Sequence, residues 1–250
     1  MVWSKELQST YAHQAKKRAY LIDCVVCESP ITQKEHDENK GRCNYCAGKE
    51  RVELMYVIFE NFLSEDECDH LVMLYQQGQS VSGLVVHNKG TFISDEDVLK
   101  CDIFDLPLDH HISNKTWHLI EDFADQHKFF INDMVGCQVM KYENNGKFVW
   151  HTDGYEPTDV LSMSIQLSHP QDYDGGEFQF GKHKNGNAQQ QATEAYDNYK
   201  ENQDNISPIM TLPRDIGTVW IYNSFLYHRV TPITKGARYS MTNWFHGEKL

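Results

Sequence analysis

The sequence lacks a long apolar run and is short of positive charge. No segment reaches the roughly 18 consecutive apolar residues of a membrane-spanning helix, and residues 1–21 contain no apolar core of signal-peptide length. With 23 lysines and arginines against 36 aspartates and glutamates, the net charge is −13, so no basic stripe can neutralise phosphates. Nucleic acid and membranes are therefore disfavoured as partners, and a cytoplasmic protein is expected.

The number of cysteines is odd, seven, which argues against a disulfide framework. Four of them form the pairs Cys24-x2-Cys27 and Cys43-x2-Cys46, separated by fifteen residues. This spacing is typical of zinc ribbons, in which four thiolates close a tetrahedral shell around the metal. We expect structural zinc there, with free thiols or disulfides as the alternatives. His36, between the pairs, could in principle replace one cysteine.

The remaining pattern predicts a chain in two parts. Residues 1–50 should hold a helix over 4–22 and the zinc-ribbon-like segment, and residues 51–250 should form one catalytic domain. Ser64-x-x-Glu67 is a capping box that predicts a helix start, with Gly78 able to end that helix. A second helix is expected over about 113–126. Three further cysteines should be small buried apolar residues: Cys68, Cys101 and Cys137.

From Gly136 onward the chain turns to short β-rich runs separated by Gly, Pro, Asn and Asp. The runs are 136–142, 147–151, 160–168, 176–181, 208–213, 217–222, 227–232 and 237–245. They predict a mainly β (α+β) fold: a jelly-roll, cupin-like double-stranded β-helix with a pocket at one mouth. Residues 182–206 are rich in Gln, Asn and Glu. We interpret them as a solvated insertion, with a lid as the alternative.

The strongest chemical signal is His151-Thr152-Asp153, followed by His228. Residues two apart in a strand point to the same face, so the first two ligands can reach one metal. His228 on a neighbouring strand would complete a two-histidine, one-carboxylate set, which leaves positions open for co-substrate and oxygen on Fe(II). A buried core role for His228 is the structural alternative.

Arg238 and Ser240 follow on the last predicted strand and share a face. A buried guanidinium offers a fork to a carboxylate, and the hydroxyl adds one donor, which together suit the far end of a dicarboxylate such as 2-oxoglutarate. The alternative is that Arg238 pairs with a carboxylate of the protein itself.

These motifs make the sequence similar to the prolyl 4-hydroxylase-like branch of the Fe(II)/2-oxoglutarate oxygenases, especially PKHD-type hydroxylases. The resemblance spans residues 52–246 and rests on the segments Tyr142–Asp153, Leu161–Pro170, Asp172–Phe178, Gly217–Ser224, His228–Pro232 and Gly236–Ser240. It implies that His151, Asp153 and His228 bind iron, that Arg238 and Ser240 bind the distal carboxylate of 2-oxoglutarate, and that Tyr142 lines its pocket.

The resemblance also implies a reaction. The cofactors would be Fe(II), 2-oxoglutarate and O2, with ascorbate as a further candidate, and the expected partner is a peptide or protein hydroxylated on a side chain, with proline leading. Because Asp153 is present, hydroxylation is favoured over halogenation, and because Arg238 is the last arginine, base repair is disfavoured. Gln166 stands where many prolyl hydroxylases carry a tyrosine that contacts 2-oxoglutarate. A small-molecule hydroxylase and a non-catalytic metal-binding module remain the alternatives.

Three weaker features complete the set. Trp150 and Trp244 flank the motifs and could line the pocket, although aromatic residues on barrel strands more often belong to the core. Gly175-Gly176 predicts a turn or bulge. Substrate choice should depend on loops such as 80–105 and 183–206.

Overall fold

The computed structural model describes residues 17–21, 55–87, 91–127, 129–154, 158–184 and 203–249. The four cysteines of the predicted zinc segment and most of the predicted insertion lie outside these ranges. Within the described ranges, no helix combines the length and apolarity needed to cross a membrane.

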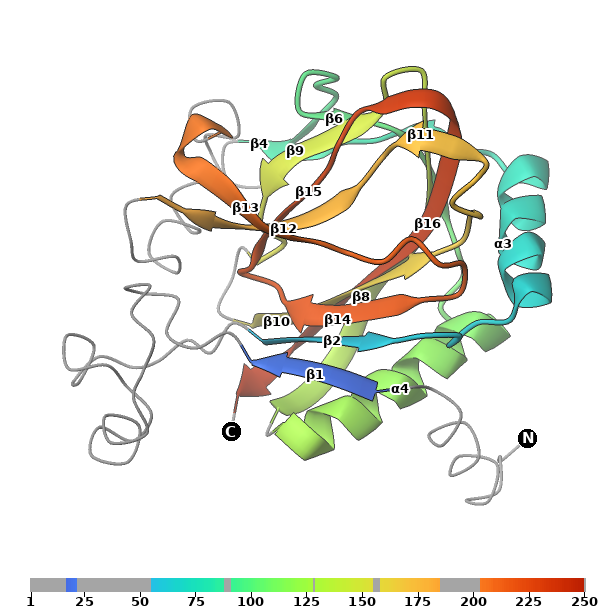
Figure 1. The fold of residues 1–250 in the computed structure, drawn as a ribbon. Coiled ribbons are helices and arrows are strands. Elements are labelled where there is room, and N and C mark those ends of the chain that lie inside the picture. The colour runs from blue at the N-terminus through green and yellow to red at the C-terminus, as the bar shows by residue number, and fades with distance from the viewer. Residues whose placement is uncertain are drawn as a thin grey trace.

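Two facing antiparallel sheets form the body of the molecule (Figure 1). The larger sheet follows the order β1-β2-β14-β10-β16-β8-β7-β3, with β11 paired to β16. Its strands are β1 (Lys17–Leu21), β2 (Met55–Phe59), β3 (Val81–Ser82), β7 (Asp102–Asp105), β8 (Phe129–Glu143), β10 (Asp159–Gln166), β11 (Tyr173–Gly175), β14 (Val219–Asn223) and β16 (Ile233–Lys249). This arrangement confirms the predicted jelly-roll class.

The smaller sheet has the order β13-β12-β15-β9-β6 and lies across the interior from the larger one (Figure 1). Its strands are β6 (Leu99–Lys100), β9 (Lys147–His151), β12 (Phe178–His183), β13 (Ile206–Thr211) and β15 (Tyr227–Val230). A separate hairpin joins β4 (Val85–His87) to β5 (Thr91–Ile93), and the 3-10 turn η1 spans Gln203–Asn205. Region 80–105, expected as loop, thus contains short strands.

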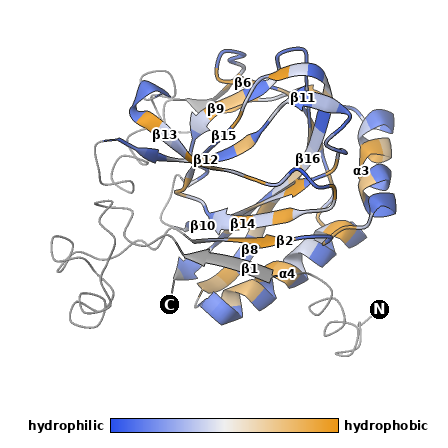
Figure 2. Ribbon diagram, viewed as in Figure 1, coloured by the Kyte–Doolittle hydropathy of each residue, from blue (hydrophilic) through white to orange (hydrophobic). Residues whose placement is uncertain are grey.

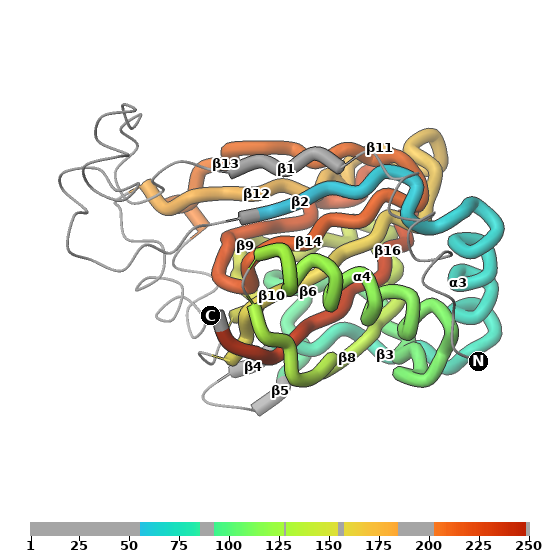
Figure 3. Tube along the Cα trace, turned by 90° about the horizontal axis from the view of Figure 1, so that it is seen from below, coloured from blue at the N-terminus to red at the C-terminus, as the bar shows by residue number. Residues whose placement is uncertain are grey.

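Strand alternation divides the core into two layers. On β14, Val219 and Ile221 pack with the helices, whereas Trp220 and Tyr222 pack between the sheets. Helices α3 (Glu65–Gln77) and α4 (His111–His127) cover the outer face of the larger sheet (Figures 1 and 3), and each carries hydrophobic residues beside hydrophilic ones (Figure 2). Because one face of the sheet is covered by helices, its other face is free to line an interior site.

Local signals placed both ends of α3 correctly. Ser64 Oγ accepts from the Glu67 backbone N–H at 3.2 Å, and the Glu67 carboxylate accepts from the Ser64 N–H at 2.8 Å, so the capping box is complete. Gly78 follows the last residue of the helix, with an extended φ of −83°. A Cβ at this position would collide with the Phe104 ring, so glycine is needed here for close packing.

The predicted helix over 4–22 is wrong at residues 17–21, which form strand β1; the rest of that range lies outside the described residues. β1 pairs with β2 over its whole length, from Lys17 opposite Phe59 to Leu21 opposite Met55. The unpaired edge of β2 supplies backbone partners that local helical spacing could not reveal.

The long pair β8 and β16 extends beyond the predicted runs 136–142 and 237–245. The two strands pair from Ala237 opposite Glu143 to Lys249 opposite Phe129, and the register shifts at two points along this ladder. Their mutual backbone hydrogen bonds continue the ladder past the residues that alternate in hydropathy. The predicted bulge at Gly175-Gly176 is confirmed, because both residues have positive φ and the register shifts beside them.

Candidate metal and co-substrate site

The two histidines of the predicted triad are direct cross-strand neighbours. His151 ends β9, His228 lies on β15, and the two residues are partners in the antiparallel ladder. They are 5% and 2% exposed, and their ring centroids are 4.1 Å apart. Strand pairing therefore brings together two candidate metal ligands that are far apart in the sequence.

Asp153 completes the group from the segment just after β9. The backbone N–H groups of Asp153 and Gly154 both donate to the Ser224 carbonyl, at 2.8 and 2.7 Å, which fixes this turn against the end of β14. The carboxylate of Asp153 lies 3.7 Å from His151 Nε2 and 3.4 Å from His228 Nε2. One potential ligand atom from each residue lies within 4.8 Å of the others, so the three residues could hold one metal ion.

Hydrogen bonds orient both imidazoles for ligation. His151 Nδ1 lies 2.7 Å from the Val149 carbonyl, and His228 Nδ1 lies 2.8 Å from the Leu226 carbonyl. A carbonyl oxygen can only accept, so Nδ1 of each ring carries the proton and Nε2 keeps its lone pair. Both Nε2 atoms face Asp153, and a donor set of two such nitrogens and one carboxylate fits divalent iron.

Burial sets the charge of the ligands. Burial, followed by the proximity of His228, lowers the pKa of His151 to about 3, so this imidazole is neutral at neutral pH. Burial alone would raise the pKa of Asp153, but the proximity of His228, helped by His151 and the Ser162 hydroxyl, outweighs burial and holds that pKa below its usual value. The site therefore presents an ionised carboxylate beside the neutral His151 ring, which is a state that can bind a cation.

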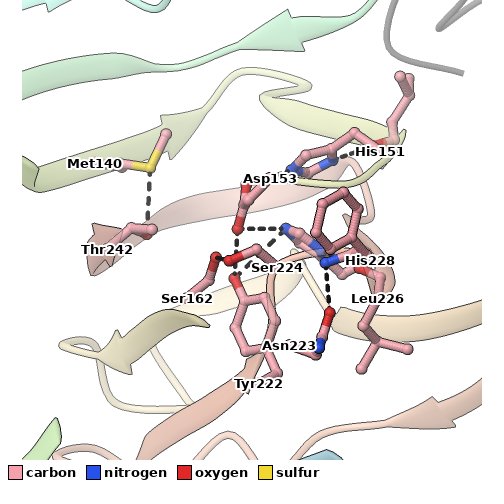
Figure 4. A network of polar contacts seen from close by, with 12 residues as sticks. Met140, His151, Asp153, Ser162, Tyr222, Asn223, Ser224, Leu226, His228 and Thr242 are labelled. Atoms are coloured by element: carbon pink, nitrogen blue, oxygen red, sulfur yellow. Dashed lines mark hydrogen bonds and ion pairs between the residues drawn. The ribbon is translucent and has the colours of Figure 1, made fainter. Parts of the chain in front are cut away.

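Two residues that the sequence did not single out support the carboxylate. Tyr222 OH donates to Asp153 Oδ2 at 3.2 Å, and Ser162 Oγ lies 3.0 Å from Ser224 Oγ. Figure 4 shows Tyr222, Ser162 and His228 converging on Asp153. Their signal in the sequence is weak: they are inward positions of β14 and β10, and only the pairing of these strands places them beside the triad.

Arg238 lies in the same interior, on β16. It is 1% exposed, its Nε donates to Gln166 Oε1 at 3.0 Å, and its Nη1 donates to Ser240 Oγ at 3.3 Å. Nη2 is buried and has no partner within the described part of the chain, where no carboxylate pairs with the guanidinium either. The alternative of a protein carboxylate on Arg238 thus finds no support there, and the unpartnered donor fits the distal carboxylate of 2-oxoglutarate.

Tyr142 lies beside Arg238 on the neighbouring strand β8. It is the strand partner of Arg238, whose guanidinium lies 5.6 Å from its ring centroid. Burial, then the nearby Cys101, raises the pKa of Tyr142 well above its usual value. Arg238 lowers this pKa and Asp153 raises it, both by smaller amounts. Tyr142 is therefore buried beside Arg238, and its role in lining the 2-oxoglutarate pocket stays a prediction.

The remaining predicted residues fall outside the site. Trp150 is 3% exposed, packs with Ile206 and Tyr227, and carries the Arg229 guanidinium 4.4 Å above its ring, so it belongs to the core. Trp244 is half-buried and faces Gly136. The three cysteines expected in the core are buried: Cys68, Cys101 and Cys137.

Comparisons with known proteins agree with this geometry. Residues 137–246 match the family described as the 2OG-Fe(II) oxygenase superfamily. A search of curated proteins found no match. Among solved structures, the chain is similar to a prolyl hydroxylase from Trichoplax adhaerens, solved in complex with a hypoxia inducible factor oxygen degradation domain peptide fragment. The identity is 14% and the TM-score 0.57, with 98% of this chain and 94% of that chain covered.

Two further solved structures have the same general fold. A Pseudomonas putida prolyl-4-hydroxylase gives 14% identity and a TM-score of 0.52, covering 76% of this chain and 91% of that chain. A viral collagen prolyl hydroxylase from Paramecium Bursaria Chlorella virus-1, in a 2OG complex, gives 17% identity and a TM-score of 0.50. The comparison covers 80% of this chain and 98% of that chain. The segment that matches the family model holds all of the triad and Arg238. That segment matches the 2OG-Fe(II) oxygenase superfamily, and the fold is prolyl 4-hydroxylase-like, as the sequence resemblance predicted.

Proposed function

We propose that this protein is an Fe(II)- and 2-oxoglutarate-dependent dioxygenase that hydroxylates a peptidyl side chain, with proline as the leading target. The observation that carries the proposal is the pairing, in one interior, of a buried triad of metal-binding type with a buried arginine whose Nη2 has no partner among the described residues. A module that only held a metal would have no physical need for that arginine.

Each part of the site has a defined task. His151, Asp153 and His228 would hold the iron, while Arg238 and Ser240 would take the distal carboxylate of 2-oxoglutarate. When bound, iron and 2-oxoglutarate supply the activation of O2, with succinate and CO2 released and one oxygen atom transferred to a C–H bond. The chain's own groups orient the ligands through the Val149 and Leu226 carbonyls and keep Asp153 ionised.

The peptide part of the proposal is supported by the neighbours of the fold. The Trichoplax adhaerens enzyme was solved with a peptide fragment, and all three structures compared are prolyl hydroxylases. The acidic chain, with its net charge of −13, favours a peptide over nucleic acid as substrate.

The test is a 2-oxoglutarate turnover assay with Fe(II), O2, ascorbate and a panel of proline- and lysine-containing peptides. We expect 2-oxoglutarate consumption stimulated by a proline peptide, which gains the mass of one oxygen. Consumption with hydroxylation of a free amino acid or small molecule, but of no peptide, would overturn the peptide assignment. No consumption at all under these conditions would leave only the metal-binding module.

We also propose one structural zinc in the N-terminal segment, bound by Cys24, Cys27, Cys43 and Cys46. The support is the C-x2-C spacing, because these residues lie outside the described ranges. Protein purified without added metal should carry about one tightly held zinc per chain, measured by elemental analysis. The double variant Cys24→Ser/Cys43→Ser should carry none, and a full equivalent retained in it would contradict the assignment.

A further inference from the structure

A line of buried hydrogen bonds leads away from the candidate co-substrate arginine. Arg238 Nε donates to Gln166 Oε1 at 3.0 Å, and Gln166 Nε2 donates to Tyr173 OH at 3.0 Å. Arg214 Nε donates to the same Tyr173 hydroxyl at 3.2 Å. The first three side chains are at most 2% exposed, so this line connects the interior site with Arg214, which is only partly buried.

The amide of Gln166 can adopt only one orientation in this line. Its Nε2 also donates to the Ser168 carbonyl at 3.0 Å, and a carbonyl can only accept, so Oε1 must face Arg238. Tyr173 is itself held firmly, because Arg214 stacks 4.1 Å from its ring centroid and donates to its carbonyl oxygen at 2.7 Å. The hydrogen bonds of Gln166 Nε2 to Ser168 and Tyr173 therefore fix the position of Oε1, the atom that accepts from Arg238.

This acceptor determines which edge of the guanidinium remains available. An arginine can receive a carboxylate on its Nε–Nη2 edge or on its Nη1–Nη2 edge. Nε has a single N–H, and this N–H already donates a hydrogen bond to Gln166 Oε1. Nη1 reaches Ser240 Oγ, and Nη2 is buried without a partner among the described residues. The free donors thus lie on the Nη1–Nη2 edge, beside the Ser240 hydroxyl.

We propose that Gln166 is a positioning residue that sets both the affinity for 2-oxoglutarate and the selection of its chain length. It does so by occupying Nε and turning the Nη1–Nη2 edge of Arg238 toward the distal carboxylate. The inference rests on the proposed function, in which Arg238 binds that carboxylate. A fixed edge favours a diacid of one length, so freeing the guanidinium weakens binding and reduces discrimination against 2-oxoadipate, which is one methylene longer.

The chain offers a matched control for this test. Gln179, on β12, is also buried and accepts from the Nε of an arginine, Arg229, at 2.8 Å. Its Nε2 donates to Glu177 and Thr211, so it too makes hydrogen bonds on both sides of its amide. Gln179→Met therefore removes equivalent contacts without touching Arg238, and any general cost of a buried Gln→Met change appears in both variants.

The experiment measures KM and kcat for 2-oxoglutarate and for 2-oxoadipate in the Fe(II)-loaded full chain. We expect Gln166→Met to raise the KM for 2-oxoglutarate by about 10-fold or more, with kcat at saturation within about 3-fold, since the guanidinium is no longer held with its Nη1–Nη2 edge toward the distal carboxylate. The preference for 2-oxoglutarate over 2-oxoadipate should fall, and Gln179→Met should change neither quantity. Gln166→Glu keeps the size and the acceptor but adds a negative charge, so it should raise the KM further.

Binding of 2-oxoglutarate to the Mn(II)-loaded protein, followed by calorimetry, gives the same comparison for any variant too slow to assay, and Tm checks folding. Wild-type KM and selectivity in Gln166→Met, beside a large KM increase in Arg238→Met, would overturn the role of Gln166 while the proposed function stands. Equal KM increases in Gln166→Met and Gln179→Met would also overturn the role of Gln166, because they would show that any buried Gln→Met change has this effect through general destabilisation. Normal 2-oxoglutarate binding by Arg238→Met would overturn both.

Discussion

The two ends of the interior site treat buried charge in opposite ways. At the triad, the Asp153 carboxylate is surrounded by His151, His228 and the Tyr222 hydroxyl. At the other end, the Arg238 guanidinium meets only neutral groups and keeps one donor unpartnered among the described residues. A buried cation without a counter-charge costs stability. The arginine end is therefore shaped for an anionic ligand that the protein itself does not supply.

The triad end gives the largest expected effect. Asp153→Ala removes the carboxylate of the group and leaves only the two histidines, so Fe(II) affinity should fall by about 100-fold or more and 2-oxoglutarate consumption should be lost. Equilibrium titration with Fe(II) under anaerobic conditions and the turnover assay measure the two quantities. Near wild-type turnover in this variant would exclude Asp153 as a ligand.

At the arginine end, a substitution should weaken the binding of 2-oxoglutarate and leave the binding of Fe(II) almost unchanged. Arg238→Met removes the uncompensated cation, so the affinity for 2-oxoglutarate should fall by about 30-fold or more, in line with roughly 2 kcal/mol or more for a charged hydrogen-bonded pair. Fe(II) affinity should stay within about 3-fold. In the absence of ligand, Arg238→Met should be at least as stable as wild type in urea unfolding, because it replaces an unpaired buried charge by an apolar side chain.

The loss of 2-oxoglutarate binding in Arg238→Met can also be measured through thermal stability. A saturating concentration of 2-oxoglutarate should raise the Tm of the metal-loaded wild-type protein, because the ligand binds only the folded state. The same addition should leave the Tm of Arg238→Met almost unchanged. An equal increase in both proteins would mean that the carboxylate binds elsewhere.

Tyr222 tests the support of the triad without removing a ligand. Its pKa is raised well above the usual value, first by burial and then by Asp153, so the phenol stays protonated and donates to the carboxylate. Tyr222→Phe should weaken Fe(II) binding by about 10-fold, the order found for groups that orient metal ligands. Tyr142→Phe, near Arg238, should instead weaken 2-oxoglutarate binding. Identical profiles for the two variants would remove the distinction between the ends.

Sequence reasoning succeeded where the determinants are local. The capping box of Ser64 and Glu67 lies within one helical turn, and the spacing of His151 and Asp153 lies within one strand end, so both could be read directly. It failed at residues 17–21, where pairing with the edge of β2 overrides helical spacing. Tyr222 and Gln166 could not be assigned roles, since their partners Asp153 and Arg238 lie 69 and 72 residues away in the sequence.

The smallest expected effect comes from a charge pair outside the site, which shows what an ordinary compensated pair contributes. Glu67 accepts from Lys115 Nζ at 2.8 Å with both carboxylate oxygens, and the two side chains are 27% and 21% exposed. Burial alone would raise the pKa of Glu67, but Lys115 and the Ser64 backbone N–H lower it below its usual value. Glu67→Gln keeps the helix cap but removes the ion pair, so it should cost only about 0.5–1 kcal/mol at neutral pH.

The sign of the pH dependence follows from that shift. Because the folded-state pKa of Glu67 is lowered, its charged form stabilises the fold above the unfolded-state pKa, roughly 4.3, and this contribution disappears as the pH falls through the folded-state pKa. The difference in unfolding free energy between wild type and Glu67→Gln should therefore be constant from about pH 7 to 5 and shrink at lower pH. Urea unfolding at a series of pH values measures it. A difference that grew with acidification would show that Glu67 is not stabilised as an anion in the folded protein.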